Sequence, residues 1–298
     1  MSFKCDCPEY IHCRDEFMCA TMTLMKTRDY AAVWRLIEYS VNDANFNMAA
    51  DEAIALMVEA GSSPPTLRFY GWAVPSVTIG AFQRIWSINT AACEAMAIPV
   101  VRRPTGGRAI VHDDELTFSF STGTASAPFS QSVLENYKAI AAAFFLAFKR
   151  LGLNCQMTQR RLRRSDIYHV SGAATANPMC FSAASYSEIT IDGRKILGAA
   201  QKRYKGALLE QGSIPISINR TLISTVFTSV TDFPDDSLTG LREFDASLTP
   251  SRVAAALAEA FEEVFSVRLL KGQLSEAEAS LTLELQKKYQ LHDWNYRK

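Results

Sequence analysis

The dipeptide Asp192-Gly193 is the feature that most narrows the folds open to this chain. Runs suited to β-strands stand on either side of it, at residues 188–191 and 195–198. Asp-Gly between two such runs is a strong short signal of a β-hairpin, because the turn needs positive backbone angles that glycine adopts without strain. The two strands of a hairpin are antiparallel, so we expect antiparallel sheet here, with Lys195 held near a rigid turn.

Strand and helix patterns continue on both sides of this hairpin. Leu116, Phe118 and Phe120 alternate with polar residues, which predicts a half-buried strand. Ser132 and Glu135 have the spacing of a capping box and should begin a long helix. Further helices are predicted to begin near Asp43, Ala91, Thr249 and Ser275, and further strands to cover residues 34–40, 66–70, 76–79, 99–103, 207–210 and 213–218.

Hairpins in the middle of the chain, with helices around them, favour an α+β fold over a doubly wound parallel one. We therefore expect a mainly antiparallel or mixed sheet flanked by helices, with Pro215 on an exposed edge because proline cannot donate to a sheet ladder. Residues 221–298 are expected to form a linker and a helical C-terminal segment packed on the domain at 30–220. Residues 1–29 are predicted to be a cysteine-rich extension, either disordered or the product of a start codon placed too early.

Charge and hydropathy exclude several classes of protein. The chain has 31 basic and 31 acidic residues, so nothing in its overall charge attracts nucleic acid or a membrane surface. Its longest strongly apolar run, residues 139–148, is about half of the roughly 20 residues that a membrane helix needs. The N-terminus lacks the basic and then apolar order of a secretion signal. We expect a cytoplasmic protein that contacts neither membrane nor nucleic acid.

Two groups of residues could suggest a metal site. The first twenty residues hold Cys5, Cys7, Cys13 and Cys19, but without the paired Cys-x-x-Cys knuckles of a zinc site. Residues 112–115 read His-Asp-Asp-Glu, yet neighbouring side chains of a strand point to opposite faces and cannot all converge on one ion. The odd total of seven cysteines indicates reduced thiols. We predict no metal.

The sequence Arg-Arg-Pro-Thr-Gly-Gly-Arg-Ala covers residues 102–109. Adjacent glycines allow a ligand to approach backbone amides closely, and the flanking arginines suit an anion. On composition alone, a binding turn and a turn with no other role are equally good interpretations.

A second cluster, at residues 176–182, contains Cys180 after an Asn-Pro turn. The turn should place the thiol on a loop, and the ammonium of Lys195 could stabilise its reactive thiolate form. The alternative is a small buried side chain, which we expect for Cys93 and Cys155.

Together, the segment at 102–109 and the segment Gly-Arg-Lys-Ile-Leu-Gly-Ala-Ala-Gln at 193–201 resemble the signatures of the biotin and lipoate protein ligase superfamily. The likeness extends from about residue 34 to the closing Trp294. Cys180, standing before the Gly-Arg-Lys hairpin, makes the chain most similar to the cysteine-dependent octanoyltransferases that load glycine cleavage H protein. A biotin or lipoate protein ligase-like catalytic domain at residues 30–220 is therefore implied.

The resemblance also implies roles for individual residues. Cys180 would accept the octanoyl group as a thioester, and Lys195 would stabilise the charge on its carbonyl oxygen. No cofactor would be needed. The implied partners are acyl carrier protein as donor and H protein or another lipoyl domain as acceptor, and we expect a monomer. The substrate-binding residues would be Arg103, Thr105, Gly106, Gly107, Arg108, His112, Gly198 and Ala199.

Other functions stay open at this point. An ATP- and magnesium-dependent lipoate ligase would bind its nucleotide with the arginines and glycines of residues 102–109, hereafter the Arg-Gly-Gly turn, and Cys180 would then have no catalytic role. An amidotransferase that moves octanoyl between lipoyl domains would share the cysteine chemistry. A binding protein without activity would need neither Cys180 nor Lys195. The basic run at residues 160–164 could meet an acidic carrier protein, or could be a solvated surface.

Overall fold

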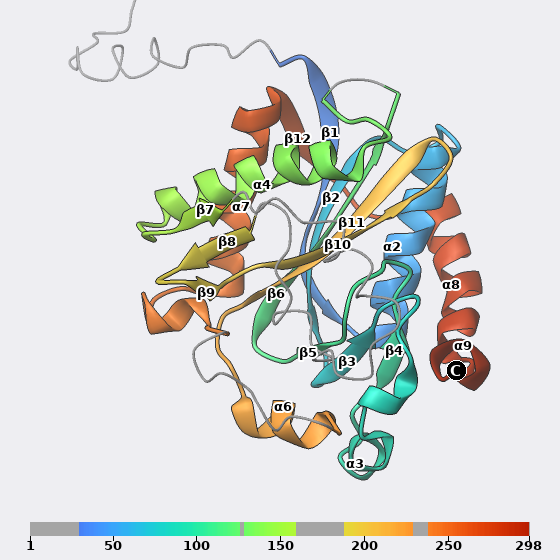
Figure 1. The fold of residues 1–298 in the computed structure, drawn as a ribbon. Coiled ribbons are helices and arrows are strands. Elements are labelled where there is room, and N and C mark those ends of the chain that lie inside the picture. The colour runs from blue at the N-terminus through green and yellow to red at the C-terminus, as the bar shows by residue number, and fades with distance from the viewer. Residues whose placement is uncertain (1–29, 126–127, 159–187, 229–237, 298) are drawn as a thin grey trace, which may run out of the picture.

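The computed structural model describes residues 30–125, 128–158, 188–228 and 238–297. Its main sheet has six strands in the order β10-β11-β6-β2-β1-β12 (Figure 1). The first three pairings in this order are antiparallel, whereas β1 runs parallel to both β2 and β12. These strands are β1 (Ala32–Asn42), β2 (Thr66–Trp72), β6 (Glu115–Gly123), β10 (Gly198–Arg203), β11 (Ala207–Pro215) and β12 (Val267–Lys271).

Two small sheets complete the β-structure of the described residues. One has the order β4-β3-β5, from β3 (Ser76–Ile79), β4 (Val100–Arg102) and β5 (Ile110–His112). The other has the order β7-β8-β9, from β7 (Gln156–Thr158), β8 (Glu188–Ile191) and β9 (Arg194–Lys195). Asp192 and Gly193 join β8 to β9 with φ values of 50° and 76°, as the predicted hairpin turn requires.

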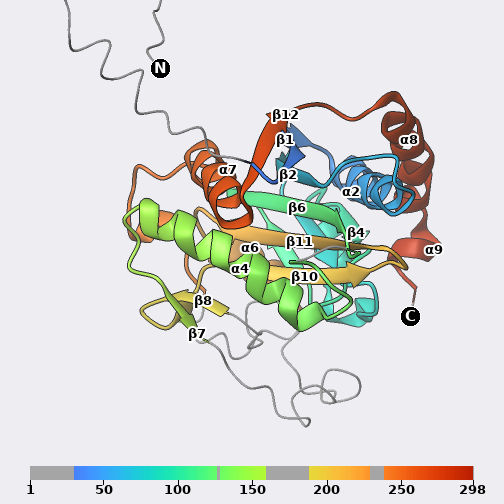
Figure 2. The same ribbon diagram turned by 90° about the horizontal axis from the view of Figure 1, so that it is seen from above.

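Helices cover both faces of the main sheet, as Figure 2 shows from above. Helices α4 (Val133–Arg150) and α7 (Pro250–Phe265) pack on one face, and α2 (Ala44–Glu59) packs on the other with α8 (Glu276–Gln290) beside it. The expected mixed sheet with flanking helices is thus confirmed. The other short helices among the described residues are η1 (Ile85–Ser87), α3 (Thr90–Ala95), α6 (Arg220–Val226), η4 (Leu241–Glu243) and α9 (His292–Asn295).

Strand β6 is buried on both faces, and its alternating sequence decides what each face contacts. Phe118 and Phe120 point into the apolar core under α4 and α7, where the ring of Phe118 lies 4.4 Å from that of Phe144. Thr117 and Ser119 point to the α2 side and make polar contacts there. Burial of each phenylalanine stabilises the fold by about 1.5 to 3 kcal/mol. The face of the sheet toward α2 therefore carries the polar side chains that can form a site.

Three local predictions were wrong. The strand expected at residues 195–198 is interrupted, because β9 ends at Lys195 and β10 begins at Gly198. Residues 207–218 were expected to form two strands, but β11 runs unbroken from Ala207 to Pro215. The glycine at position 212 belongs to the strand and not to a turn: any side chain at this position would collide with the ring of Phe118. Pro215 is not on an exposed edge, because it is buried and β11 lies between β10 and β6. Its missing N–H is tolerated because β11 pairs with β10 only as far as Ser213, whereas Pro215 lies beside Glu115 of β6.

The predicted helix starts at Asp43, Thr249 and Ser275 are confirmed by side-chain caps. The predicted capping box at Ser132 forms only in part. The Ser132 hydroxyl accepts a hydrogen bond from the Glu135 N–H, as predicted. The Glu135 carboxylate, however, accepts from the Ser130 hydroxyl, and the Ser132 N–H donates to that same hydroxyl. In the parts of the chain that the structure describes, none of the helices has the length and apolar character needed to cross a membrane.

Candidate active site

A pocket lies between the main sheet and the small sheet β4-β3-β5. It crosses the main sheet from β10 to β2, a path of about 14 Å because neighbouring strands lie about 4.8 Å apart. Its wall combines apolar, aromatic and polar side chains, as expected for a small-molecule site. The lining residues are Met48, Tyr70, Trp72, Thr78, Arg103, Ile110, His112, Thr117, Ala199, Ala200, Gln211 and Gly212.

An aromatic pair closes the β2 end of this pocket. The Trp72 indole stacks on the His112 imidazole, with ring centroids 4.0 Å apart and an interplanar angle of 18°. The indole N–H donates to the Thr117 hydroxyl at 2.7 Å and to the Glu115 carboxylate at 3.2 Å. The stacking and these hydrogen bonds hold the indole in one orientation, so this end of the pocket is a rigid wall.

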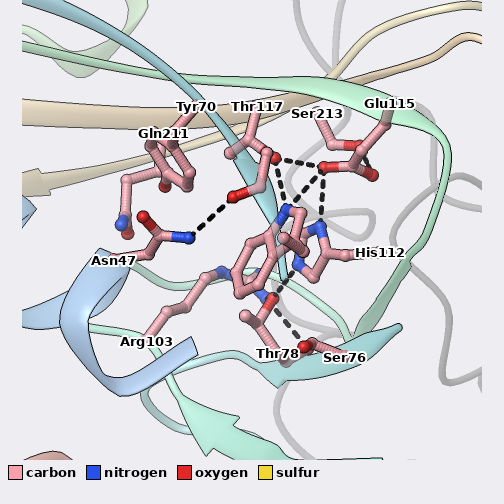
Figure 3. Close-up of polar contacts among 12 residues, drawn as sticks. Asn47, Tyr70, Ser76, Thr78, Arg103, His112, Glu115, Thr117, Gln211 and Ser213 are labelled. Carbon is pink, nitrogen blue, oxygen red and sulfur yellow. Dashed lines mark hydrogen bonds and ion pairs between the residues drawn. The ribbon is translucent and has the colours of Figure 1, made fainter. Parts of the chain in front are cut away.

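His112 is held on both ring nitrogens, as Figure 3 shows. Its Nδ1 lies 2.8 Å from Glu115 Oε1, and its Nε2 lies 2.8 Å from the Thr78 hydroxyl. Ser213 donates to the other Glu115 oxygen at 2.6 Å. Burial opposes ionisation of Glu115, but its ion pair with His112 and the hydroxyl donors outweigh that effect and lower its pKa.

A buried carboxylate, which the sequence interpretation missed, supports the pocket from α2. Asp51 is fully buried and accepts from Arg68 at 2.7 Å, Tyr70 at 2.7 Å and Ser119 at 2.6 Å. Burial, followed by the Asp51 charge, raises the pKa of Tyr70 well above its ordinary range. Asn47 stands four residues before Asp51 in an alanine-rich helix and also bonds Arg68, so a polar pair at helical spacing was the available signal.

This network reaches the Arg-Gly-Gly turn through one glutamine. The Gln211 amide donates to Asp51 at 2.7 Å and accepts from the Thr105 hydroxyl at 2.8 Å. The turn also stabilises itself, because Arg103 donates to the carbonyl oxygens of Gly106 at 2.6 Å and Arg108 at 2.8 Å. Gly107 has a φ of 86°, in the region that favours glycine.

Arg102, the first arginine of the turn segment, is fully buried and reaches the C-terminal part of the chain. Its guanidinium donates to the carbonyl oxygens of Trp294, Asn295 and Arg297 at 3.0 to 3.1 Å, and to that of Gly80 at 2.9 Å. Burial, followed by the neighbouring Arg297 charge, lowers the pKa of Arg102 to about 10. The C-terminal segment therefore fixes the strand that leads into the turn.

The predicted site residues are brought together only in part. Arg103, His112 and Ala199 line the pocket, and Gly198 begins β10 just before it. Lys195 is buried at the end of β9, four residues before Ala199. Cys180 and the basic run at 160–164 lie outside the described residues, as do the four N-terminal cysteines.

The predicted lack of a metal centre stays a prediction. Cys93 and Cys155 are buried, as expected of structural thiols, and burial raises the pKa of each. Among the described residues, no group of three or more His, Cys, Asp and Glu side chains could hold a metal ion.

Comparison with known proteins places this site in a family. Residues 43–262 match the lipoyl protein ligase A/B catalytic domain, and the chain belongs to that family. Octanoyltransferase LipM of Kyrpidia tusciae is 34% identical over 275 residues, which cover 89% of this chain and 99% of that protein. Octanoyltransferase LipM of Bacillus subtilis is 30% identical, with 89% and 98% covered.

Solved structures share the same fold. A lipoate-protein ligase A bound with ATP superposes with a TM-score of 0.72 at 24% identity, covering 88% of this chain and 98% of the ligase. A bipartite lipoate protein ligase from Thermoplasma acidophilum gives a TM-score of 0.72 at 23% identity, covering 89% and 96%. The expected superfamily fold is confirmed.

Proposed function

We propose that this chain is an octanoyltransferase of protein lipoylation that holds the acyl group as a thioester on Cys180. The observation that supports it most is the likeness to octanoyltransferases along nearly their whole length. Support from the site is the pocket that runs across the main sheet from Ala199 on β10 to Trp72 on β2.

The pocket suits an extended acyl chain. Ala199, Ala200 and Gly212 leave a narrow apolar passage at the β10 side, and the aromatic wall stands at the β2 side. Each buried methylene of an octanoyl chain contributes about 0.8 kcal/mol, so the chain contributes about 5 kcal/mol to binding. Burial would thus hold the acyl group while donor and acceptor exchange.

The proposed reaction has two halves. The Cys180 thiolate attacks the donor thioester carbonyl, a new C–S bond forms, and the donor leaves as a thiolate that takes up a proton. The neutral amine of an acceptor lysine then attacks the acyl-enzyme, a C–N bond forms, and Cys180 leaves with its sulfur protonated by the amine proton. The Lys195 ammonium would stabilise the carbonyl oxygen as it gains charge in both halves.

The partners follow from this chemistry. We propose a lipoyl domain or glycine cleavage H protein as acceptor and acyl carrier protein as donor. Thioester exchange needs no ATP, metal or redox cofactor. The remaining predictions, a monomer in the cytoplasm with a boundary at residue 220, stay predictions.

A transfer assay tests the proposal. Purified protein, octanoyl acyl carrier protein and unmodified H protein are mixed without ATP, and octanoyl H protein is followed by mass spectrometry. We expect transfer with ping-pong kinetics. Product that forms only from free octanoate or lipoate with ATP and magnesium would identify a ligase, and transfer from an octanoylated lipoyl domain alone would identify an amidotransferase.

A further inference from the structure

The loop at residues 80–87, hereafter the aromatic loop, exposes two large apolar side chains. The Phe82 side chain is 91% exposed and that of Trp86 is 54% exposed. A single exposed apolar residue is normal on a protein surface, but two aromatic rings on one short loop form a patch of the kind that binds other proteins.

The aromatic loop is held firmly from behind. Arg102 donates to the carbonyl oxygens of Gly80 at 2.9 Å and Gln83 at 2.6 Å, and Arg297 donates to that of Ala81 at 2.6 Å. Thr228 donates through its hydroxyl to the Trp86 carbonyl at 3.1 Å. Backbone fixed at both ends of the loop makes the display of Phe82 a preorganised feature, which lowers the entropy cost of binding a partner.

The aromatic loop also borders the acyl pocket. It follows Thr78, which lines the pocket, and the Ala81 N–H donates to the Thr105 carbonyl at 2.8 Å. Gly80 packs so closely on the Arg-Gly-Gly turn that a side chain there would collide with the Gly107 carbonyl. A protein bound to the aromatic loop would therefore lie beside the turn that contains Gly106 and Gly107.

Two exposed arginines lie on or behind the aromatic loop. Arg84 is exposed between the two rings, and the aromatic loop contains no acidic residue. Arg297 is exposed behind the loop, where its guanidinium lies 4.4 Å from the Trp294 ring centroid. Aromatic and arginine side chains are common hot spots of protein interfaces. The positive charge of the arginines favours an acidic partner.

We propose that the aromatic loop is the docking surface for the acyl donor, a small acidic carrier protein that presents the octanoyl group as a thioester on a flexible arm. This inference rests on the proposed function. It assigns Phe82 as the apolar anchor and Arg84 as the charged contact, and it predicts that the two residues act on the carrier protein and not on the acyl chain.

Two donors separate this inference from the proposed function. Acylation rates are measured with octanoyl acyl carrier protein and with octanoyl pantetheine, a thioester that lacks the protein. For Phe82→Ala and Arg84→Glu we expect kcat/KM to fall about tenfold with the carrier protein and to stay at the parental value with octanoyl pantetheine. The Arg84→Glu loss should shrink at high salt.

Matched controls are Leu283→Ala and Arg268→Glu, which change an exposed leucine on α8 and an exposed arginine on β12. Both should keep parental rates with either donor. The inference would be overturned if Phe82→Ala and Arg84→Glu react with the carrier protein at the parental rate. An equal loss with both donors, or a loss confined to the acceptor step, would also overturn it. If the parent accepts octanoyl from neither donor, the proposed function itself is wrong.

Discussion

Loss of the Asp51 charge should destabilise the whole domain, because its four partners are buried around it. The substitution Asp51→Asn keeps the size of the side chain but leaves the Arg68 guanidinium, 2% exposed, without a counter-charge. Removing one member of a buried ion pair costs about 3 to 5 kcal/mol. That is a large fraction of the roughly 5 to 15 kcal/mol by which a domain is stable.

Urea unfolding followed by fluorescence measures this effect. The control Asp293→Asn, on a fully exposed side chain, should change the free energy of unfolding by less than about 0.5 kcal/mol. The double variant Asp51→Asn/Arg68→Gln, which removes both charges, should be more stable than Asp51→Asn alone. A loss below about 1 kcal/mol for Asp51→Asn would refute the assignment of Asp51 as the electrostatic centre of this network.

Three further predictions concern the pocket, the sheet and the turn. Trp72→Ala removes the wall at the β2 end, so the ratio of decanoyl to octanoyl transfer, measured with competing donors, should rise; an unchanged ratio would place the acyl terminus elsewhere. Burial raises the pKa of Glu210 from 4.5 to about 8. Between these two pH values, the folded state of the parent keeps a proton that the unfolded state has lost. The free energy of unfolding therefore falls by up to about 1.4 kcal/mol per pH unit as the pH rises through this window. The variant Glu210→Gln should show a weaker pH dependence of the free energy of unfolding, measured by urea unfolding. The same pH dependence in variant and parent would contradict the raised pKa of Glu210. Gly80→Ala should lower both thermal stability and transfer rate through its collision with the Gly107 carbonyl, whereas Gly61→Ala, in open space at positive φ, should affect stability alone.

Local signals in the sequence predicted most of the fold correctly. Caps at Asp43, Thr249 and Ser275 and the Asp192-Gly193 turn depend on neighbouring residues only, and each is present. The predicted break between residues 210 and 213 was wrong because Gly212 lies against Phe118 on the adjacent strand, a contact that sequence spacing does not show.

The site was predicted where a motif is continuous in the chain and missed where it depends on distant contacts. Arg103 and His112 belong to one run of residues in the sequence, and both line the pocket. Asp51 was missed because it bonds Gln211, far away in the sequence. Arg102 was expected to suit an anion, but it is buried and bonds the distant Trp294 carbonyl oxygen instead. The roles of Cys180 and Lys195 stay predictions.

The most direct test of the central claim is the mass of the intact protein after mixing with octanoyl acyl carrier protein in the absence of ATP. We expect an octanoyl adduct that hydroxylamine removes, that maps to Cys180, and that is absent from Cys180→Ser while Cys155→Ser retains it. No adduct on Cys180, with transfer unchanged in Cys180→Ser, would contradict the thioester mechanism.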